Sequence, residues 1–87
     1  MNIYKINEHT SYGDKGLTFT TGFNSAVLAI TSRIDTTKDV AIFNEKGFVH
    51  NPNKPIDWYL KKGYSVGNYC GWYIPKYYSI EKINLKK

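Results

Sequence analysis

The feature that most constrains this chain is an aromatic segment at residues 57–78. It holds both Trp residues, one Pro and six of the eight Tyr residues within 22 positions. Aromatic side chains combine a large apolar area with a polar group, so they dominate both small cores and binding surfaces. So short a chain must therefore bury most of these rings in a small core or use some of them to bind a partner.

Length and cysteine content predict one small domain, residues 1–87, without a disulfide. A domain of this size buries only about 60% of its unfolded surface, so its core is modest. The one cysteine, Cys70, excludes an intramolecular disulfide and a Cys-X-X-Cys metal or redox pair. Packing alone must hold the fold, which suits a reducing cytosol.

The beginning of the sequence and its hydropathy favour a cytoplasmic protein without a membrane partner. The first residues lack the charged and then apolar layout of a signal peptide. No apolar run approaches the ~20 residues of a membrane-spanning helix, and the longest, Ala26 to Ile30, has the length of a core segment.

The charge balance favours an acidic partner that is attracted electrostatically, without recognition of a nucleotide sequence. Lys and Arg total 12 against seven acids, for a net charge of +5, and Arg33 is the one Arg. Arg is the preferred residue for bidentate recognition of phosphates and base edges, whereas Lys acts as a mobile point charge. The abundance of Lys, Asn, Ile and Tyr is also typical of an A/T-rich gene, as in a phage or mobile element of a low-GC host.

The first part of the chain predicts two strands with a loop between them, followed by one segment that fits either a helix or a strand. Residues 2–7 and 17–20 alternate as strands do, and the polar stretch Glu8 to Gly16 between them is predicted to be a loop. Phe23 to Ile34 fits a helix capped by Thr21 or Asn24, but it also fits a buried strand.

The second part predicts two hairpins and another ambiguous segment. Val40–Phe43 and Phe48–His50 flank a turn with Gly47 at a positive-φ position, and Gly67-Asn68 marks a second hairpin. Between them, Ile56 to Lys62 fits either a short helix that begins after Pro55 or a strand.

Four motifs, in this order, resemble those of SH3 domains: an aromatic first strand, a Leu-Ser-Phe-x-x-Gly turn, a Trp strand and a Gly-Tyr-Ile-Pro segment. They are Ile3–Ile6, Leu17–Gly22, Asp57–Leu60 and Gly71–Tyr78, followed by Ser79 to Ile83 as the closing strand, and together they cover about half of the chain. The resemblance implies a mainly β, small SH3-like antiparallel barrel that binds proteins and is not an enzyme.

The chain departs from the SH3 pattern at three places. Ile6 and Tyr77 replace a Tyr and an Asn of the family, and Ser32 to Ile56 exceeds the usual loop by roughly 25 residues. An insertion of that length is tolerated because closure entropy grows slowly with loop length. Its apolar residues predict a folded accessory hairpin. The alternative fold is a mixed α+β sheet with a helix near residues 22–34.

The resemblance implies a shallow aromatic groove for polyproline-type peptides. Such a preformed extended ligand loses little entropy when it stacks on flat rings. The groove would be lined by Tyr4, Tyr12, Trp58, Pro75 and Tyr78. The competing interpretation is that Trp58 and Tyr78 are core residues of a small aromatic-rich domain.

A basic rim beside this groove keeps a second ligand class open. Lys61, Lys62 and Lys76 flank Trp58 and Pro75, and the Lys86-Lys87 tail adds to them. Lys interleaved with rings also describes a platform for single-stranded DNA or RNA. The plainer interpretation is a solvated, charged surface.

The remaining chemistry-bearing residues predict no catalytic, metal or cofactor site. His9 and His50 are far apart in sequence and are interpreted as loop histidines, while Asp14 and Glu8 could face a cationic peptide residue. Cys70 is interpreted as a small core residue, and no phosphate loop or nucleophile elbow is found. We therefore expect a phage- or mobile-element-type inhibitor that occludes a host protein through an aromatic and Lys-rich face, with nucleic-acid binding as the alternative.

Overall fold

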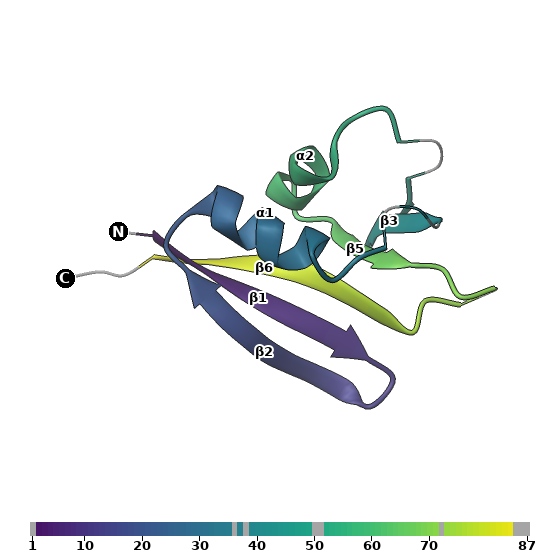
Figure 1. Ribbon diagram of the computed structural model, residues 1–87, viewed down its shortest axis with the longest axis horizontal. Coiled ribbons are helices and arrows are strands. Elements are labelled where there is room, and N and C mark those ends of the chain that lie inside the picture. Colours follow the sequence, from purple (N-terminus) through teal and green to yellow (C-terminus); the bar gives the residue numbers. More distant parts are fainter. Residues whose placement is uncertain (1, 36, 38, 50–51, 72, 85–87) are drawn as a thin grey trace.

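The computed structural model describes residues 2–35, 37, 39–49, 52–71 and 73–84. Its elements, in chain order, are β1 (Asn2–Thr10), β2 (Gly13–Thr20), α1 (Phe23–Thr31), β3 (Val40–Asn44), β4 (Gly47–Phe48), α2 (Ile56–Lys61), β5 (Ser65–Asn68) and β6 (Lys76–Asn84). The strands form one antiparallel six-stranded sheet in the order β2-β1-β6-β5-β3-β4. Both helices lie on the same side of strands β1 and β6 (Figure 1).

The prediction of a mainly β, antiparallel fold is confirmed, but the sheet is not closed. Its order begins at β2 and ends at β4, so these two strands are edges within the described part of the chain. The alternative expectation, a mixed sheet with a helix near residues 22–34, matches α1. The segment Asp57–Leu60, which the SH3 resemblance assigns to a strand, lies in α2.

Helix α1 forms because its apolar residues recur on one side. Ala26 and Ile30 follow at helical spacing and are buried against the sheet, whereas Leu28 on the far side is exposed. The capping prediction was wrong: the N-cap is Gly22 and no side chain caps the helix. The tertiary contacts of the apolar stripe, rather than a cap, therefore stabilise this short helix.

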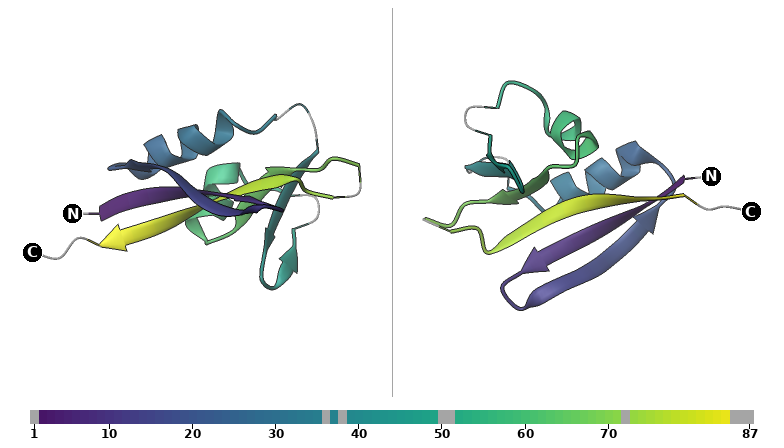
Figure 2. Two further views of the ribbon diagram at one scale, coloured as in Figure 1. Left: turned by 90° about the horizontal axis from the view of Figure 1, so that it is seen from below. Right: turned by 180° about the vertical axis from the view of Figure 1, so that it is seen from behind.

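The core lies between the two helices and one face of the sheet, which we call the inner face. Strand side chains alternate between the two faces of a sheet. Each central strand accordingly contributes one residue to the core cluster, namely Ile6 from β1, Ile42 from β3, Val66 from β5 and Tyr78 from β6. The view from behind shows the helices on the same side of the strands (Figure 2). No helix of the described chain is long and apolar enough to cross a membrane.

The predicted loop from Glu8 to Gly16 was wrong. Strand β1 continues to Thr10, and β2 begins at Gly13, with His9 paired to Asp14. The turn is closed by Thr10, whose hydroxyl donates to the Gly13 carbonyl at 3.1 Å and accepts the Tyr12 N–H at 3.1 Å. Polar residues are compatible with these strands because the outer face of the hairpin carries no helix.

The accessory hairpin predicted between residues 40 and 50 is confirmed for its described part. Phe43 pairs with Phe48, and Gly47 has a φ of 135°, as the predicted turn required. Strand β3 also pairs with β5, so the hairpin is part of the main sheet. His50 lies outside the described residues.

The second predicted turn was placed too early in the chain. Gly67 and Asn68 lie inside β5, and the chain reverses between Cys70 and Tyr73, where Gly71 has a φ of 68°. Gly67 serves close packing instead, because a Cβ there would lie 2.4 Å from the Lys76 carbonyl oxygen.

Candidate functional site

Helix α2 presents three of the predicted binding residues to solvent. Its buried side chains, Tyr59 and Leu60, fix its orientation on the core. The Trp58 side chain therefore points outward and is 41% exposed, with its ring edge-on to Tyr59 at 5.0 Å between centroids. The Lys62 ammonium lies 5.5 Å from the Trp58 ring centroid, and Lys61 is also exposed.

A groove of about 560 Å³ adjoins α2 on the same side of the sheet. Its apolar lining comes from Tyr4, Phe23, Leu60 and Ile80, and the rings of Tyr4 and Phe23 meet edge to face at 5.6 Å. Among the described residues that line the groove, two are charged, and both are cations: Lys61 and Lys82. We call these six residues, together with Trp58 and Lys62, the α2 surface.

The structure separates the other predicted site residues from the α2 surface. Tyr12 is fully exposed at the β1–β2 turn. Pro75, Lys76 and Tyr78 border a smaller hollow of about 210 Å³ beside Arg33. Tyr4, Trp58, Lys61 and Lys62 thus gather around α2, and the remaining four do not join them. Trp72, Lys86 and Lys87 lie outside the described residues.

Tyr78 lies in the core, as the competing interpretation held for it. Its side chain is 6% exposed, and its hydroxyl donates to Glu8 Oε2 at 3.3 Å. Burial and then the negative charge of Glu8 raise the pKa of the Tyr78 hydroxyl. Glu8 pairs with the buried Tyr78 across β1 and β6 and so faces the helix side, whereas Asp14 pairs with His9 and faces the other side. Glu8 also lies 3.7 Å from the Lys15 ammonium.

The outer face of the sheet carries a row of touching rings, which we call the aromatic band. The His9 ring stacks on Tyr77 at 4.6 Å, and Tyr77 meets Phe43 edge to face at 4.8 Å. Phe43 continues to Phe48 at 5.6 Å, and Phe48 continues to Tyr69 at 6.2 Å. The cross-strand pairs place His9, Tyr77 and Phe43 on the face opposite the core.

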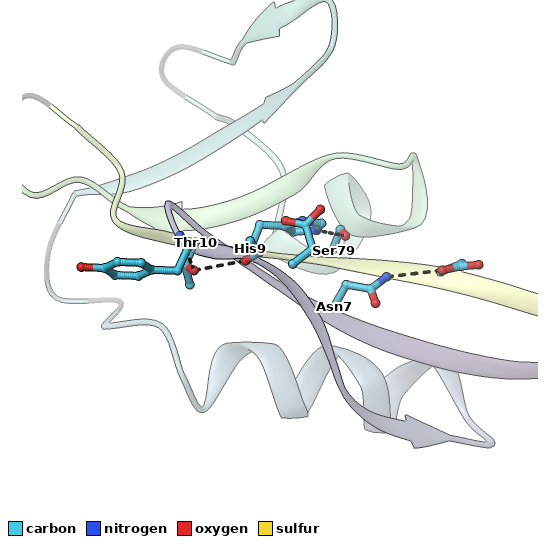
Figure 3. Close-up of polar contacts among 8 residues, drawn as sticks. Asn7, His9, Thr10 and Ser79 are labelled. Carbon is cyan, nitrogen blue, oxygen red and sulfur yellow. Dashed lines mark hydrogen bonds and ion pairs between the residues drawn. The ribbon is translucent and has the colours of Figure 1, made fainter.

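Beside this band, a polar row runs across three strands (Figure 3). His9 Nδ1 lies 2.8 Å from Asp14 Oδ1, and His9 Nε2 lies 2.8 Å from Ser79 Oγ. One step along, the Asn7 amide donates to Glu81 at 3.4 Å. Three strands, β2, β1 and β6, therefore position an acid, a base and a hydroxyl in line.

Sequence reasoning missed this row because it placed His9 and Asp14 in a loop. The signal was Gly13, which with Ser11-Tyr12 allows a tight two-residue turn. That turn makes His9 and Asp14 direct cross-strand neighbours. Ser79 could not be found from local sequence, because it is 70 residues away from His9.

The described residues contain no group of three or more His, Cys, Asp or Glu side chains that could hold a metal ion. Comparison of the chain with models of protein families, with curated proteins and with solved structures found no match. The SH3-like resemblance therefore rests on the sequence motifs alone.

Proposed function

We propose that this protein is a non-enzymatic binding module whose protein partner docks on the α2 surface. The observation that carries the proposal is the apolar groove in which Lys61 and Lys82 supply the charge, next to the half-exposed Trp58. Aromatic residues beside apolar pockets are typical binding hot spots. The cations favour carboxylates at the rim of the complex, where they speed association and fix orientation.

The part of the partner that binds this surface is an apolar side chain flanked by acidic residues. Tyr4, Phe23 and Leu60 offer an apolar floor for a side chain such as Leu or Phe. Lys61 and Lys82, with Lys62 above Trp58, lie where carboxylates of the same partner would approach. The partner is a host protein, or an extended peptide segment of it, and the module acts by covering that protein's functional surface, as inhibitors from phages or mobile elements do.

Nucleic acid is the second candidate, and the ring geometry favours it less. A platform for single strands stacks successive bases on successive exposed rings. On the α2 surface Trp58 is the strongly exposed ring, while Tyr4 and Phe23 pack against each other. The aromatic band has more rings, but acids such as Asp14 and Glu45 line the hollow beside it. Phosphates are therefore poorly matched to the band.

Affinity capture with matched variants tests the proposal. Immobilised wild type, Trp58→Ala and Tyr12→Ala are exposed to host lysate with and without nuclease, at low and moderate salt. Tyr12 is the control because it is exposed and lies away from the α2 surface. We expect one protein to be retained by wild type and Tyr12→Ala after nuclease treatment, and to be lost with Trp58→Ala.

Two results would contradict the proposal. Loss of all retained material on nuclease treatment, with affinity for RNA or single-stranded DNA that falls steeply with salt, would assign the surface to nucleic acid. Equal capture by Trp58→Ala and wild type would place the binding site elsewhere on the domain.

A further inference from the structure

We propose that Ser79 is a nucleophile activated by His9 and Asp14, which accepts an acyl group from an activated carboxylic ester or thioester. The three side chains form one line across the outer face: Asp14 Oδ1 to His9 Nδ1 at 2.8 Å, then His9 Nε2 to Ser79 Oγ at 2.8 Å. An acid, an imidazole and a hydroxyl in this order are the parts of an acyl-transfer site, which is recognised by geometry and not by sequence position.

Asp14 sets the hydrogen-bonding roles along the line. Its carboxylate only accepts, so the neutral imidazole of His9 carries its proton on Nδ1 and donates it to Asp14. Nε2 then presents a lone pair, and the Ser79 hydroxyl donates to it. His9 is thereby held as a base toward Ser79.

Packing holds the imidazole in this orientation. The His9 ring stacks on the Tyr77 ring at 4.6 Å with an angle of 15° between planes. Its side chain is 18% exposed, whereas that of Asp14 is 69% exposed. The base is therefore sheltered and fixed, while solvent reaches the line from the Asp14 side.

Ser79 lies where the sheet offers room for a substrate. The pairing of β5 with β6 consists of Val66 with Tyr78 and Gly67 with Tyr77, and Ser79 is the next residue of β6. A hollow of about 560 Å³ lies at this place, lined by Ser79, His9, Ser65 and the rings of Phe43 and Tyr77. The rings suit an apolar acyl or aryl group, which defines the substrate class.

The chemical step is a single acyl transfer. Ser79 Oγ forms a bond to the carbonyl carbon of the donor while its proton passes to His9 Nε2. The tetrahedral adduct collapses, the bond from carbon to the leaving oxygen or sulfur breaks, and His9 returns the proton to the leaving group. The products are an O-acyl Ser79 and the free alcohol or thiol. This step modifies Ser79 once and is not a catalytic cycle, so it is compatible with a non-enzymatic module. It uses the outer face and does not depend on a partner at the α2 surface.

The test uses p-nitrophenyl acetate as the probe. The full chain is incubated with the ester, and peptide mapping by mass spectrometry follows acetylation at Ser79, at Ser65 and at the lysines. Ser65 is the internal control, because it lines the same hollow and belongs to no such line of hydrogen bonds in the described structure. We expect Ser79 to be acetylated about a hundredfold faster than Ser65, the range of general-base assistance.

Variants test whether Ser79 reacts because His9 and Asp14 activate it or only because it is exposed. His9→Gln should slow acetylation of Ser79 by about a hundredfold, and Asp14→Asn by about tenfold or more, while Ser65→Ala leaves it unchanged.

The proposal is overturned if Ser79 reacts no faster than Ser65, or if folded Asp14→Asn and His9→Gln both react like wild type. Circular dichroism shows whether each variant is folded. Because Asp14 is exposed, Asp14→Asn leaves the packing intact and keeps the test decisive if His9→Gln unfolds.

Discussion

The two faces of this sheet differ in what covers them and in what they present. The inner face is covered by α1 and α2 and buries Ile6, Val66 and Tyr78, and its rim carries the α2 surface with its lysines. The outer face has the aromatic band and the polar row of Asp14, His9 and Ser79. Aromatic and Lys-rich character, which the sequence predicted for one face, is therefore divided between two.

Adjacent residues of β6 show why this division is hidden in the sequence. Tyr77 and Tyr78 are the same residue type one position apart. Tyr78 is buried on the inner face and donates to Glu8, whereas Tyr77 lies on the outer face under His9. A strand alternates its side chains between faces, so neighbouring residues serve different surfaces.

Substitutions that reach the core should show the largest difference in stability between the two faces. Ile6→Ala removes a fully buried side chain under the helices and should cost about 2–5 kcal/mol of unfolding free energy. Ile3→Ala, on the outer face of the same strand, should cost less than half as much, because Ile3 is only partly buried. Urea denaturation of both variants measures the difference. Equal losses would show that the outer face is packed as tightly as the inner one.

A substitution at the close contact between β5 and β6 should have a smaller effect on stability. Gly67→Ala would place a Cβ 2.4 Å from the Lys76 backbone oxygen, so the strands must separate, at a cost of roughly 1–3 kcal/mol. Gly22→Ala is the matched control, since its Cβ would meet Ser25 Oγ at an ordinary 3.7 Å. Thermal denaturation compares the two. A Gly67→Ala variant as stable as Gly22→Ala would mean that the two strands are not in close contact.

The smallest expected effect concerns the Tyr78 hydroxyl. Tyr78→Phe should lose about 1 kcal/mol at neutral pH, because Glu8 loses its donor. The folded pKa of Tyr78 is raised by burial and by Glu8, so the unfolded chain releases this proton first as pH rises. The stability that the hydroxyl contributes is present below about pH 10 and is lost as pH rises through the folded pKa.

Denaturation at several pH values checks this sign. The gap between wild type and Tyr78→Phe should narrow above about pH 10. A gap that widened there would mean that the phenolate, and not the phenol, is the form that the fold stabilises.

The sequence predicted the fold where local chemistry decides it. The turn at Gly47 follows from neighbours a few residues apart, and the apolar spacing of α1 kept a helix there as one of two alternatives. The open sheet depends on strand pairing between distant segments, which periodicity cannot supply. The helix that begins after Pro55 was one of the two local alternatives, and it contradicts only the strand that the SH3 resemblance assigned to Trp58. The turn predicted at Gly67 was wrong, because the role of this residue is a close approach to Lys76 and not a turn.

The candidate site was predictable to a similar extent. Tyr4, Trp58, Lys61 and Lys62 come together around α2, and Lys61 and Lys62 follow Trp58 within one turn of its helix. Phe23 and Lys82 were not anticipated, because they reach the groove from α1 and β6. The polar row needed the register of three strands at once, which only the folded sheet provides.

The most direct test of the central claim compares one aromatic residue from each face in partner binding. Isothermal titration of the captured partner against wild type, Trp58→Ala and Phe48→Ala measures the contribution of the α2 surface and of the aromatic band. We predict that Trp58→Ala weakens binding by about 2 kcal/mol or more, while the protein stays folded and Phe48→Ala binds as wild type does. Full affinity of Trp58→Ala together with a loss in Phe48→Ala would place the partner on the open face and contradict the account.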